Sequence, residues 1–138
     1  INEHIKQVND ISIYNDSKST NLDSTQIAIC SFKQSVRLIM GGKLKVYNDS
    51  DYFRFQSYLK RHVCSLVVFG EASTTLVSHY NNVVLLRVVK TMKEALDVSL
   101  KMSLAEDTIV FSPGYSSFDQ FDNFEHRGTL FKEMVNAL

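Results

Sequence analysis

The sequence has few of the features that mark disordered, membrane-spanning or polyanion-binding proteins. It has one proline and five glycines in 138 residues, and it contains no linker or low-complexity tract. Its longest apolar runs, such as residues 83–86, are far too short to cross a bilayer. Lys plus Arg and Asp plus Glu both number 15, so the net charge is 0. This balance argues against attraction of the whole chain to nucleic acid or to an anionic membrane.

The N-terminus and the two cysteines bear on processing and compartment. The first five residues have neither the basic end nor the apolar stretch of a signal peptide. The chain starts with Ile1 rather than Met, and we expect it to be a piece of a longer protein. Cys30 and Cys64 lie in apolar segments, which predicts two reduced, buried thiols in a cytosolic protein.

Three common catalytic or binding patterns are missing. Neither glycine-rich phosphate motif, G-x-x-x-x-G-K-[ST] or G-x-G-x-x-G, occurs. The four histidines never fall three or four residues apart, so no metal-ligand spacing is present. No serine stands in the G-x-S-x-G context of an activated nucleophile. The sequence therefore does not indicate a nucleotide-binding glycine-rich loop, a metal centre or a serine hydrolase.

Short apolar runs predict the strands. Three runs rich in Val, Ile and Phe are each followed closely by glycine: 36–40, 64–69 and 108–111. Continuous runs of this kind are typical of parallel strands buried on both faces. At the N-terminus, residues 4–8 and 11–14 flank Asn9-Asp10, a two-residue turn signal that predicts an antiparallel hairpin.

The segments between these runs have helical periodicity. Their apolar residues recur at three- and four-residue steps. Ser50 or Asp51 is expected to cap one helix, and Thr91 has capping-box spacing to Glu94 in another. The predicted helices run through 23–32, 51–63, 72–80, 92–99 and 129–138.

This order of elements predicts one α/β domain over residues 1–138. We expect a mostly parallel sheet of about six strands, with an N-terminal antiparallel arm and helices on both faces. Ligands of such sheets bind beyond the carboxyl ends of the strands. That rule selects four loops: 15–21, 41–49, 70–73 and 112–118.

The composition of these loops leaves alternatives open. Residues 41–45 (GGKLK) are too few to wrap a triphosphate, and they form either a turn with solvated lysines or a site for one anionic group. Residues 15–21 form either a solvated turn or a set of donors around one carboxylate. Ser117 has capping-box spacing to Gln120, so it is open to a structural role. Residues 36–62 hold six basic and two acidic side chains, which suits an anionic ligand.

Three motifs resemble the Mur ligase family, in its D-glutamate-adding branch. They are residues 14–21 (YNDSKSTN), 39–45 (IMGGKLK) and 112–128 (SPGYSSFDQFDNFEHRG). Their order and spacing agree with the family, and the resemblance spans the whole chain. Sibling Mur ligases have different residues at the first and third motifs.

The resemblance implies the C-terminal domain of a three-domain ligase, with a Rossmann-like fold. The family joins D-glutamate to UDP-N-acetylmuramoyl-L-alanine through an acyl phosphate, in cytoplasmic peptidoglycan synthesis. ATP and Mg²⁺ would be held mainly by a central domain outside this chain, as would the UDP-sugar by another. The present domain would position the amino acid and be inactive alone. No nucleic acid or membrane partner is expected.

The resemblance also implies roles for individual residues. Asp16 and Lys18 stand where the family contacts the nucleotide, and Asp16 is suited to accept hydrogen bonds from ribose hydroxyls. Thr20 and Lys45 stand where the family holds one carboxylate of D-glutamate. Lys43 is a second candidate amine for that carboxylate.

The other carboxylate of D-glutamate is assigned to the third motif. Ser117 and Phe124 stand where the family holds it, and Phe124 is expected to act through its backbone amide. Tyr115 is bulkier than the residue usual in the family. The alternative to a ligase domain is a standalone Rossmann-like binding or interaction module without catalysis, and the mass of the natural product separates the two.

Overall fold

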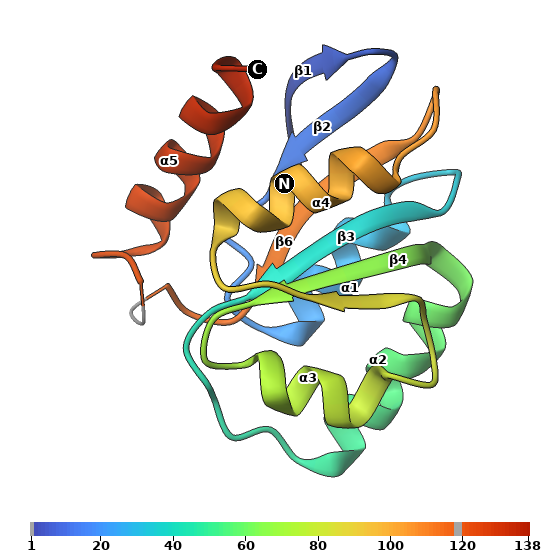
Figure 1. Cartoon of the computed structure of the whole chain (residues 1–138). Helices are drawn as coiled ribbons and strands as arrows, with labels where there is room; N and C mark the ends of the chain where they lie inside the picture. The colour runs from blue at the N-terminus through green and yellow to red at the C-terminus, as the bar shows by residue number, and fades with distance from the viewer. Residues whose placement is uncertain (1, 118–119) are drawn as a thin grey trace.

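The computed structural model describes residues 2–117 and 120–138, and these form a six-stranded sheet with helices packed on it (Figure 1). The strands are β1 (Glu3–Val8), β2 (Ile11–Asn15), β3 (Val36–Gly41), β4 (Val63–Phe69), β5 (Leu86–Val88) and β6 (Thr108–Gly114). Their spatial order is β1-β2-β6-β3-β4-β5. β1 pairs with β2 in antiparallel fashion, and every other pairing is parallel. The predicted fold class is confirmed.

The N-terminal hairpin turns at the predicted dipeptide. Asn9 and Asp10 have φ angles of 51° and 65°, the left-handed region that a two-residue hairpin turn requires. Asn and Asp tolerate this region better than most residues. The hairpin places β2 beside β6, so the segment after β2 lies next to the end of β6.

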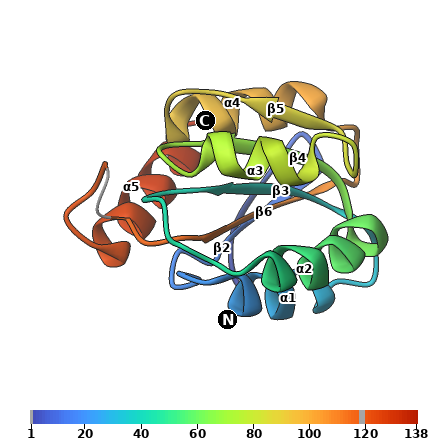
Figure 2. The same ribbon diagram turned by 90° about the horizontal axis from the view of Figure 1, so that it is seen from below.

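Helices cover both faces of the sheet. They are α1 (Leu22–Cys30), α2 (Asp49–His62), α3 (Ser73–Tyr80), α4 (Met92–Met102) and α5 (Phe124–Asn136). One apolar core holds side chains of α1, α2 and α3, and a second holds side chains of α4 and α5. Figure 2 shows α1 and α2 on one side of the sheet and α4 on the other. None of these helices is long and apolar enough for a bilayer, as judged over the described residues.

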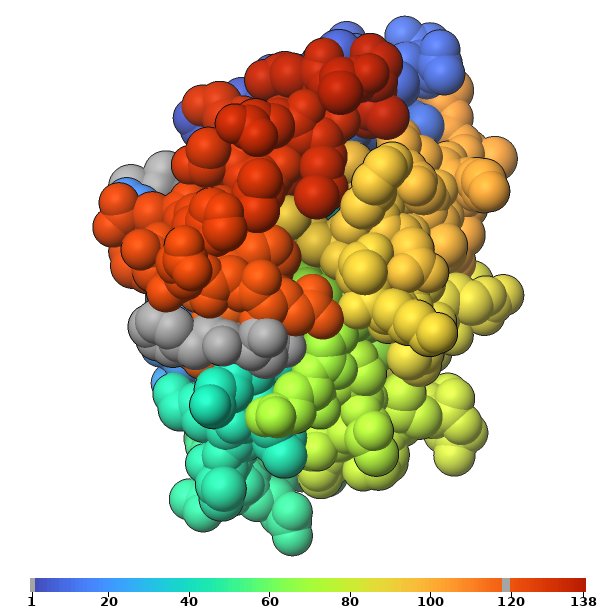
Figure 3. All heavy atoms as spheres, turned by 60° about the vertical axis from the view of Figure 1, so that its left-hand side comes forward, coloured from blue at the N-terminus to red at the C-terminus, as the bar shows by residue number. Residues whose placement is uncertain are grey.

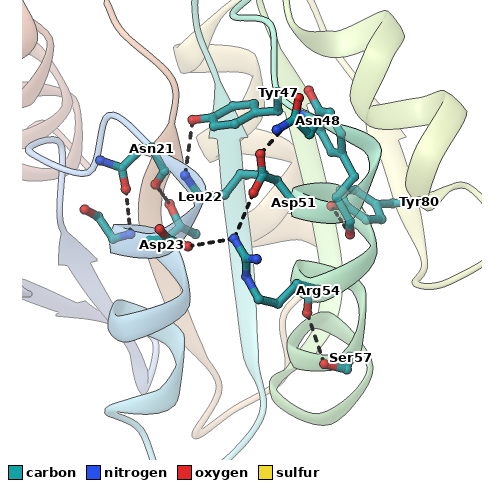
Figure 4. Close-up of polar contacts among 12 residues, drawn as sticks. Asn21, Leu22, Asp23, Tyr47, Asn48, Asp51, Arg54, Ser57 and Tyr80 are labelled. Carbon is teal, nitrogen blue, oxygen red and sulfur yellow. Dashed lines mark hydrogen bonds and ion pairs between the residues drawn. The ribbon is translucent and has the colours of Figure 1, made fainter.

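Helix starts agree with the sequence in part. The Thr91 hydroxyl accepts from the Glu94 N–H at 3.2 Å, as predicted for α4. The cap of α2 is Asn48, so the prediction of Ser50 or Asp51 is wrong. The Asp51 carboxylate accepts from the Asn48 N–H at 3.1 Å, which closes the first turn from within the helix. Figure 4 shows this contact.

The predicted start of the last helix at residue 129 is also wrong. α5 begins at Phe124, and the side chain of its cap, Asn123, accepts from the His126 N–H at 2.7 Å. The extra turn contains Arg127 and Gly128, which interrupt the apolar periodicity of the sequence. Both are nevertheless buried, because they face the segment after β2.

The prediction of two buried cysteines is wrong as well. Cys30 and Cys64 are free thiols, and both are exposed. Cys30 is the last residue of α1, where the helix end leaves it uncovered. Cys64 lies near the start of β4, where the register against β3 is irregular, and its Sγ donates to the Val36 carbonyl at 3.4 Å. An apolar neighbourhood in sequence therefore did not imply burial at the ends of these two elements.

Candidate functional site

The four selected loops meet at the carboxyl end of the parallel strands (Figure 1). They follow β2, β3, β4 and β6. These four strands are adjacent in the sheet, in the order β2-β6-β3-β4, and β1 and β5 form its edges. The Lys43 N–H donates to the Ser116 carbonyl at 2.9 Å, and this bond joins the loops after β3 and β6. The Ala72 N–H donates to the Gly42 carbonyl at 2.9 Å, and this bond joins the loops after β4 and β3.

Gly42 permits the close approach of two of these loops. Its φ is 141°, in the region that favours glycine. A Cβ at this position would lie 2.3 Å from the Ser116 carbonyl oxygen. Figure 3 shows the loop after β3 (teal) beside the start of α3 (light green) on the same face, where the Leu44 N–H donates to the Glu71 carboxylate at 2.8 Å.

Arg127 joins the loops after β2 and β6. Its side chain is fully buried. Nε donates to the Ser17 hydroxyl at 3.0 Å, Nη2 to the Ser17 carbonyl at 2.7 Å, and Nη1 to the Tyr115 carbonyl at 2.9 Å. Sequence reasoning assigned no role to Arg127, although it lies within the third motif. A buried guanidinium with three directed bonds fixes loop geometry more firmly than a surface arginine does.

Asp16 has an internal role that the sequence did not reveal. Its carboxylate is buried and accepts hydrogen bonds from the hydroxyls of Ser19 and Ser112, the latter at 2.9 Å. Its backbone N–H donates to the Phe111 carbonyl at 2.7 Å. Asp16 thereby fastens the loop after β2 to β6. Contact between Asp16 and a ribose stays a prediction.

Lys18 is exposed between two cavities of about 460 and 450 Å³. Both cavities are lined by Asp16 and Lys18. The first extends toward Phe124 and Lys132 on α5, and the second toward α1. The predicted nucleotide-contacting residues therefore lie together, beside space of ligand size.

Tyr47 joins the loop of Lys45 to the helix start that follows Thr20. The exposed Lys45 places its Nζ 5.2 Å from the centre of the Tyr47 ring. The Tyr47 hydroxyl accepts from the N–H of Leu22, two residues after Thr20, at 3.2 Å. Burial raises the pKa of Tyr47 to about 12, so its hydroxyl is protonated at neutral pH. Lys43 lies on the same loop and is also exposed.

Ser117 has a buried hydroxyl without a hydrogen-bond partner among the described residues. The Ser117 carbonyl accepts from the Gln120 and Phe121 N–H groups at 3.3 and 2.9 Å, so the backbone closes the turn and the side chain does not cap it. Buried polar atoms are nearly always satisfied, and this one is available to a ligand or a water molecule. Phe118 and Asp119, which belong to the same predicted loop and motif, lie outside the described residues.

Phe124 is the first residue of α5. Its N–H therefore has no acceptor within the helix, and the helix dipole favours an anion there. Its carbonyl accepts from the Ser17 hydroxyl at 2.7 Å, which ties the helix start to the loop after β2. This geometry is compatible with the predicted role of the Phe124 amide.

The described part of the chain does not fit a magnesium ion. No three His, Cys, Asp or Glu side chains gather in residues 2–117 and 120–138. Among the residues that the structure describes at this end of the sheet, the buried carboxylate is that of Asp16, and it accepts from two serine hydroxyls. The arrangement provides ammonium groups, hydroxyls and a helix N-terminus, which suit carboxylates or phosphates.

Solved structures share this fold at low sequence identity. A murein peptide ligase from Psychrobacter arcticus matches with a TM-score of 0.62 and 12% identity, over 99% of this chain and 30% of that one. The Escherichia coli protein FolC in complex with ADP matches with a TM-score of 0.59 and 15% identity, over 98% of this chain and 31% of that one. A domain of a Haemophilus ducreyi protein matches with a TM-score of 0.60 and 13% identity, over 96% of this chain and 98% of that one.

Curated relatives match almost the whole chain at higher identity, although no protein-family model matches it. A protein of Acidobacterium capsulatum is 34% identical over 135 residues, and one of Lactobacillus johnsonii is 37% identical over 141 residues. These matches cover 98% and 99% of this chain. The chain spans only 29% of the length of either relative.

The curated relatives show that nearly the whole chain resembles one part of a Mur-type ligase. Its relatives from Acidobacterium capsulatum and Lactobacillus johnsonii are UDP-N-acetylmuramoylalanine–D-glutamate ligases. The family resemblance of the three sequence motifs is thus confirmed.

Proposed function

We propose that this chain is the C-terminal domain of a ligase that joins D-glutamate to UDP-N-acetylmuramoyl-L-alanine in cytoplasmic peptidoglycan synthesis. In that reaction ATP phosphorylates the free carboxylate of the UDP-linked substrate and leaves as ADP. The amine of D-glutamate then attacks the acyl phosphate, an amide forms, and inorganic phosphate leaves. The present domain holds D-glutamate so that its amine faces the acyl phosphate.

D-Glutamate carries two carboxylates, and the loops offer two separate groups of donors. Thr20 and the Lys45 ammonium lie on loops that Tyr47 joins, and we assign them to one carboxylate. The unpartnered hydroxyl of Ser117 and the N–H of Phe124 lie in the third motif, and we assign them to the other. Asp16 and Lys18 are assigned to the nucleotide across the domain boundary. ATP and Mg²⁺ are bound mainly by a central domain.

One observation carries this proposal: identity of 33–37% to D-glutamate ligases extends over nearly the whole chain. The geometry adds support, since all four loops of the predicted site meet at one end of the sheet. Without the relatives, the same geometry would suit many small anions.

The test is amino-acid selectivity in the longer protein that contains this chain. Phosphate release from ATP is measured with UDP-N-acetylmuramoyl-L-alanine and each of D-glutamate, L-glutamate and L-lysine. Release that depends on D-glutamate, with formation of the matching amide, supports the proposal. Equal release with a basic amino acid, or a mature natural chain of only this length, would contradict it.

A further inference from the structure

Tyr47 contacts each of the loops that carry the proposed D-glutamate ligands. It lies on the loop after β3, two residues beyond Lys45 (Figure 4). Its hydroxyl donates to the Gly114 carbonyl at the end of β6, at 3.0 Å. The same hydroxyl accepts from the Leu22 N–H at the start of α1, at 3.2 Å. One oxygen atom thus bridges segments that are 25 and 67 residues away in sequence.

These bonds belong to a hydrogen-bond network that fixes the backbone on both sides of Thr20. The Gly114 N–H donates to the Ser19 carbonyl at 2.9 Å. Ser19 directly precedes Thr20 and Leu22 follows it by two residues; Ser19 bonds to Gly114 directly, and Leu22 is linked to Gly114 through the Tyr47 hydroxyl. The backbone around Thr20 is therefore fixed relative to the end of β6 and to the Lys45 loop.

The Tyr47 ring makes further contacts with Lys45 and with two other tyrosines. The Lys45 ammonium lies 5.2 Å from the ring centre, a distance at which a cation is attracted to an aromatic face. The ring also meets the edges of Tyr52 and Tyr115, each with centroids 5.6 Å apart. Tyr115 stands two residues before Ser117, and its hydroxyl is 2.9 Å from that of Tyr52.

We propose that Tyr47 is a positioning residue for the amino-acid site: it holds the loops of Thr20, Lys45 and Ser117 at the spacing that a dicarboxylate needs. This inference rests on the proposed function. The hydroxyl bonds to two backbone groups of opposite polarity, so its removal takes one partner away from the Leu22 N–H and one from the Gly114 carbonyl. The loops then lose their common anchor while the ligand side chains themselves stay unchanged.

The test is steady-state kinetics of the full-length ligase with Tyr47→Phe, which keeps the ring and removes only the hydroxyl. We expect KM for D-glutamate to rise about three- to tenfold, as the loss of one or two neutral hydrogen bonds would give. KM for ATP and kcat at saturating D-glutamate should stay within about twofold, because the variant leaves the reacting groups in place. Tyr47→Leu, which also removes the surface under Lys45, should raise KM further.

Tyr58→Phe is the matched control, since Tyr58 lies on α2 and its ring stacks on His62 rather than on a loop of the site. It should leave both KM values unchanged. The proposal is overturned if Tyr47→Phe leaves KM for D-glutamate unchanged while Lys45→Ala and Ser117→Ala raise it. It is also overturned if Tyr47→Phe raises both KM values together. If Lys45→Ala and Ser117→Ala change nothing either, the proposed site itself is wrong, and the role of Tyr47 falls with it.

Discussion

Two lysines of the loop after β3 are both exposed but differ in their surroundings. The backbone of Lys43 pairs with Ser116, while the ammonium of Lys45 lies over the Tyr47 ring. We expect Lys45→Ala to raise KM for D-glutamate roughly ten- to a hundredfold, because a charge-assisted bond contributes about 1.5–3 kcal/mol. KM for ATP should change much less. Phosphate release at varied D-glutamate measures both.

Lys43→Ala is the control for this prediction. It removes an equal charge from the same loop, so a general electrostatic effect would appear in both variants. If Lys43→Ala carries the defect and Lys45→Ala does not, the motif register is off by two residues. If neither has an effect, the basic loop is a solvated turn.

Ser117 and Ser112 permit a second comparison between a ligand contact and a structural one. The Ser117 hydroxyl has no described partner, so Ser117→Ala should not lower the melting temperature. It should nevertheless raise KM for D-glutamate. The Ser112 hydroxyl donates to the buried Asp16 carboxylate at 2.9 Å, so Ser112→Ala should cost about 1–3 kcal/mol of stability. Thermal melts together with kinetics distinguish the two, and a Ser117→Ala variant that melts early with normal KM would contradict the assignment.

At the scale of elements, an ion pair joins β3 to the start of β6. Arg37 Nε lies 2.8 Å from Asp107 Oδ2, and the Leu104 N–H donates to the same oxygen at 2.8 Å. Burial alone would raise the pKa of Asp107, but the Leu104 amide and the Arg37 guanidinium outweigh it, so the pKa is lowered. The ionised form therefore stabilises the fold above the ordinary carboxyl pKa, and this stabilisation is lost as the pH falls through the lowered value.

Asp107→Asn should consequently destabilise the domain by on the order of 1 kcal/mol near neutral pH. The difference from wild type should shrink as the pH is lowered below the ordinary carboxyl range, because the wild-type protein then loses the Asp107 charge. Urea midpoints of both proteins over a pH series give the measurement. A difference that stays constant across the series would show that the ion pair contributes nothing.

The sequence predicted elements better where apolar periodicity and caps coincide. Thr91 and Glu94 gave the start of α4 correctly, and Asn9-Asp10 gave the hairpin. The first turn of α5 was missed because Arg127 has the sequence character of a surface residue. Its burial depends on the Ser17 and Tyr115 carbonyls, which lie 110 and 12 residues away. No local pattern contains that information.

For the candidate site, the sequence predicted which loops lie together but not the residues that connect them. Strand ends selected four loops that lie together in the structure, because parallel strands deliver their carboxyl ends to one edge. The residues that connect the loops, Arg127 and Tyr47, were not predicted. Their roles follow from the strand order β2-β6-β3, which is a long-range property that periodicity does not encode.

At the scale of the whole molecule, the chain should fold on its own. Two apolar cores, one on each face of the sheet, are built from its own side chains. The isolated chain should give a dispersed amide NMR spectrum and unfold cooperatively in urea. A spectrum with collapsed dispersion would contradict this.

The isolated chain should not turn over ATP. Its sequence has no phosphate-binding loop, and no acidic cluster for Mg²⁺ occurs in the residues that the structure describes. Phosphate release by the purified chain should equal the background with or without UDP-N-acetylmuramoyl-L-alanine and D-glutamate. Turnover that Asp16→Asn abolishes would place catalytic machinery in this domain after all.

The central claim is that this domain itself holds the amino acid, and amide NMR of the isolated ¹⁵N-labelled chain tests it most directly. D-Glutamate is titrated to millimolar concentrations, with D-lysine as the control ligand. The account predicts shifts that saturate and gather at the amides of four residues, with none from D-lysine: Thr20, Lys45, Ser117 and Phe124. Shifts that are absent there, or equally large in the hairpin turn at Asn9 and Asp10, would contradict it.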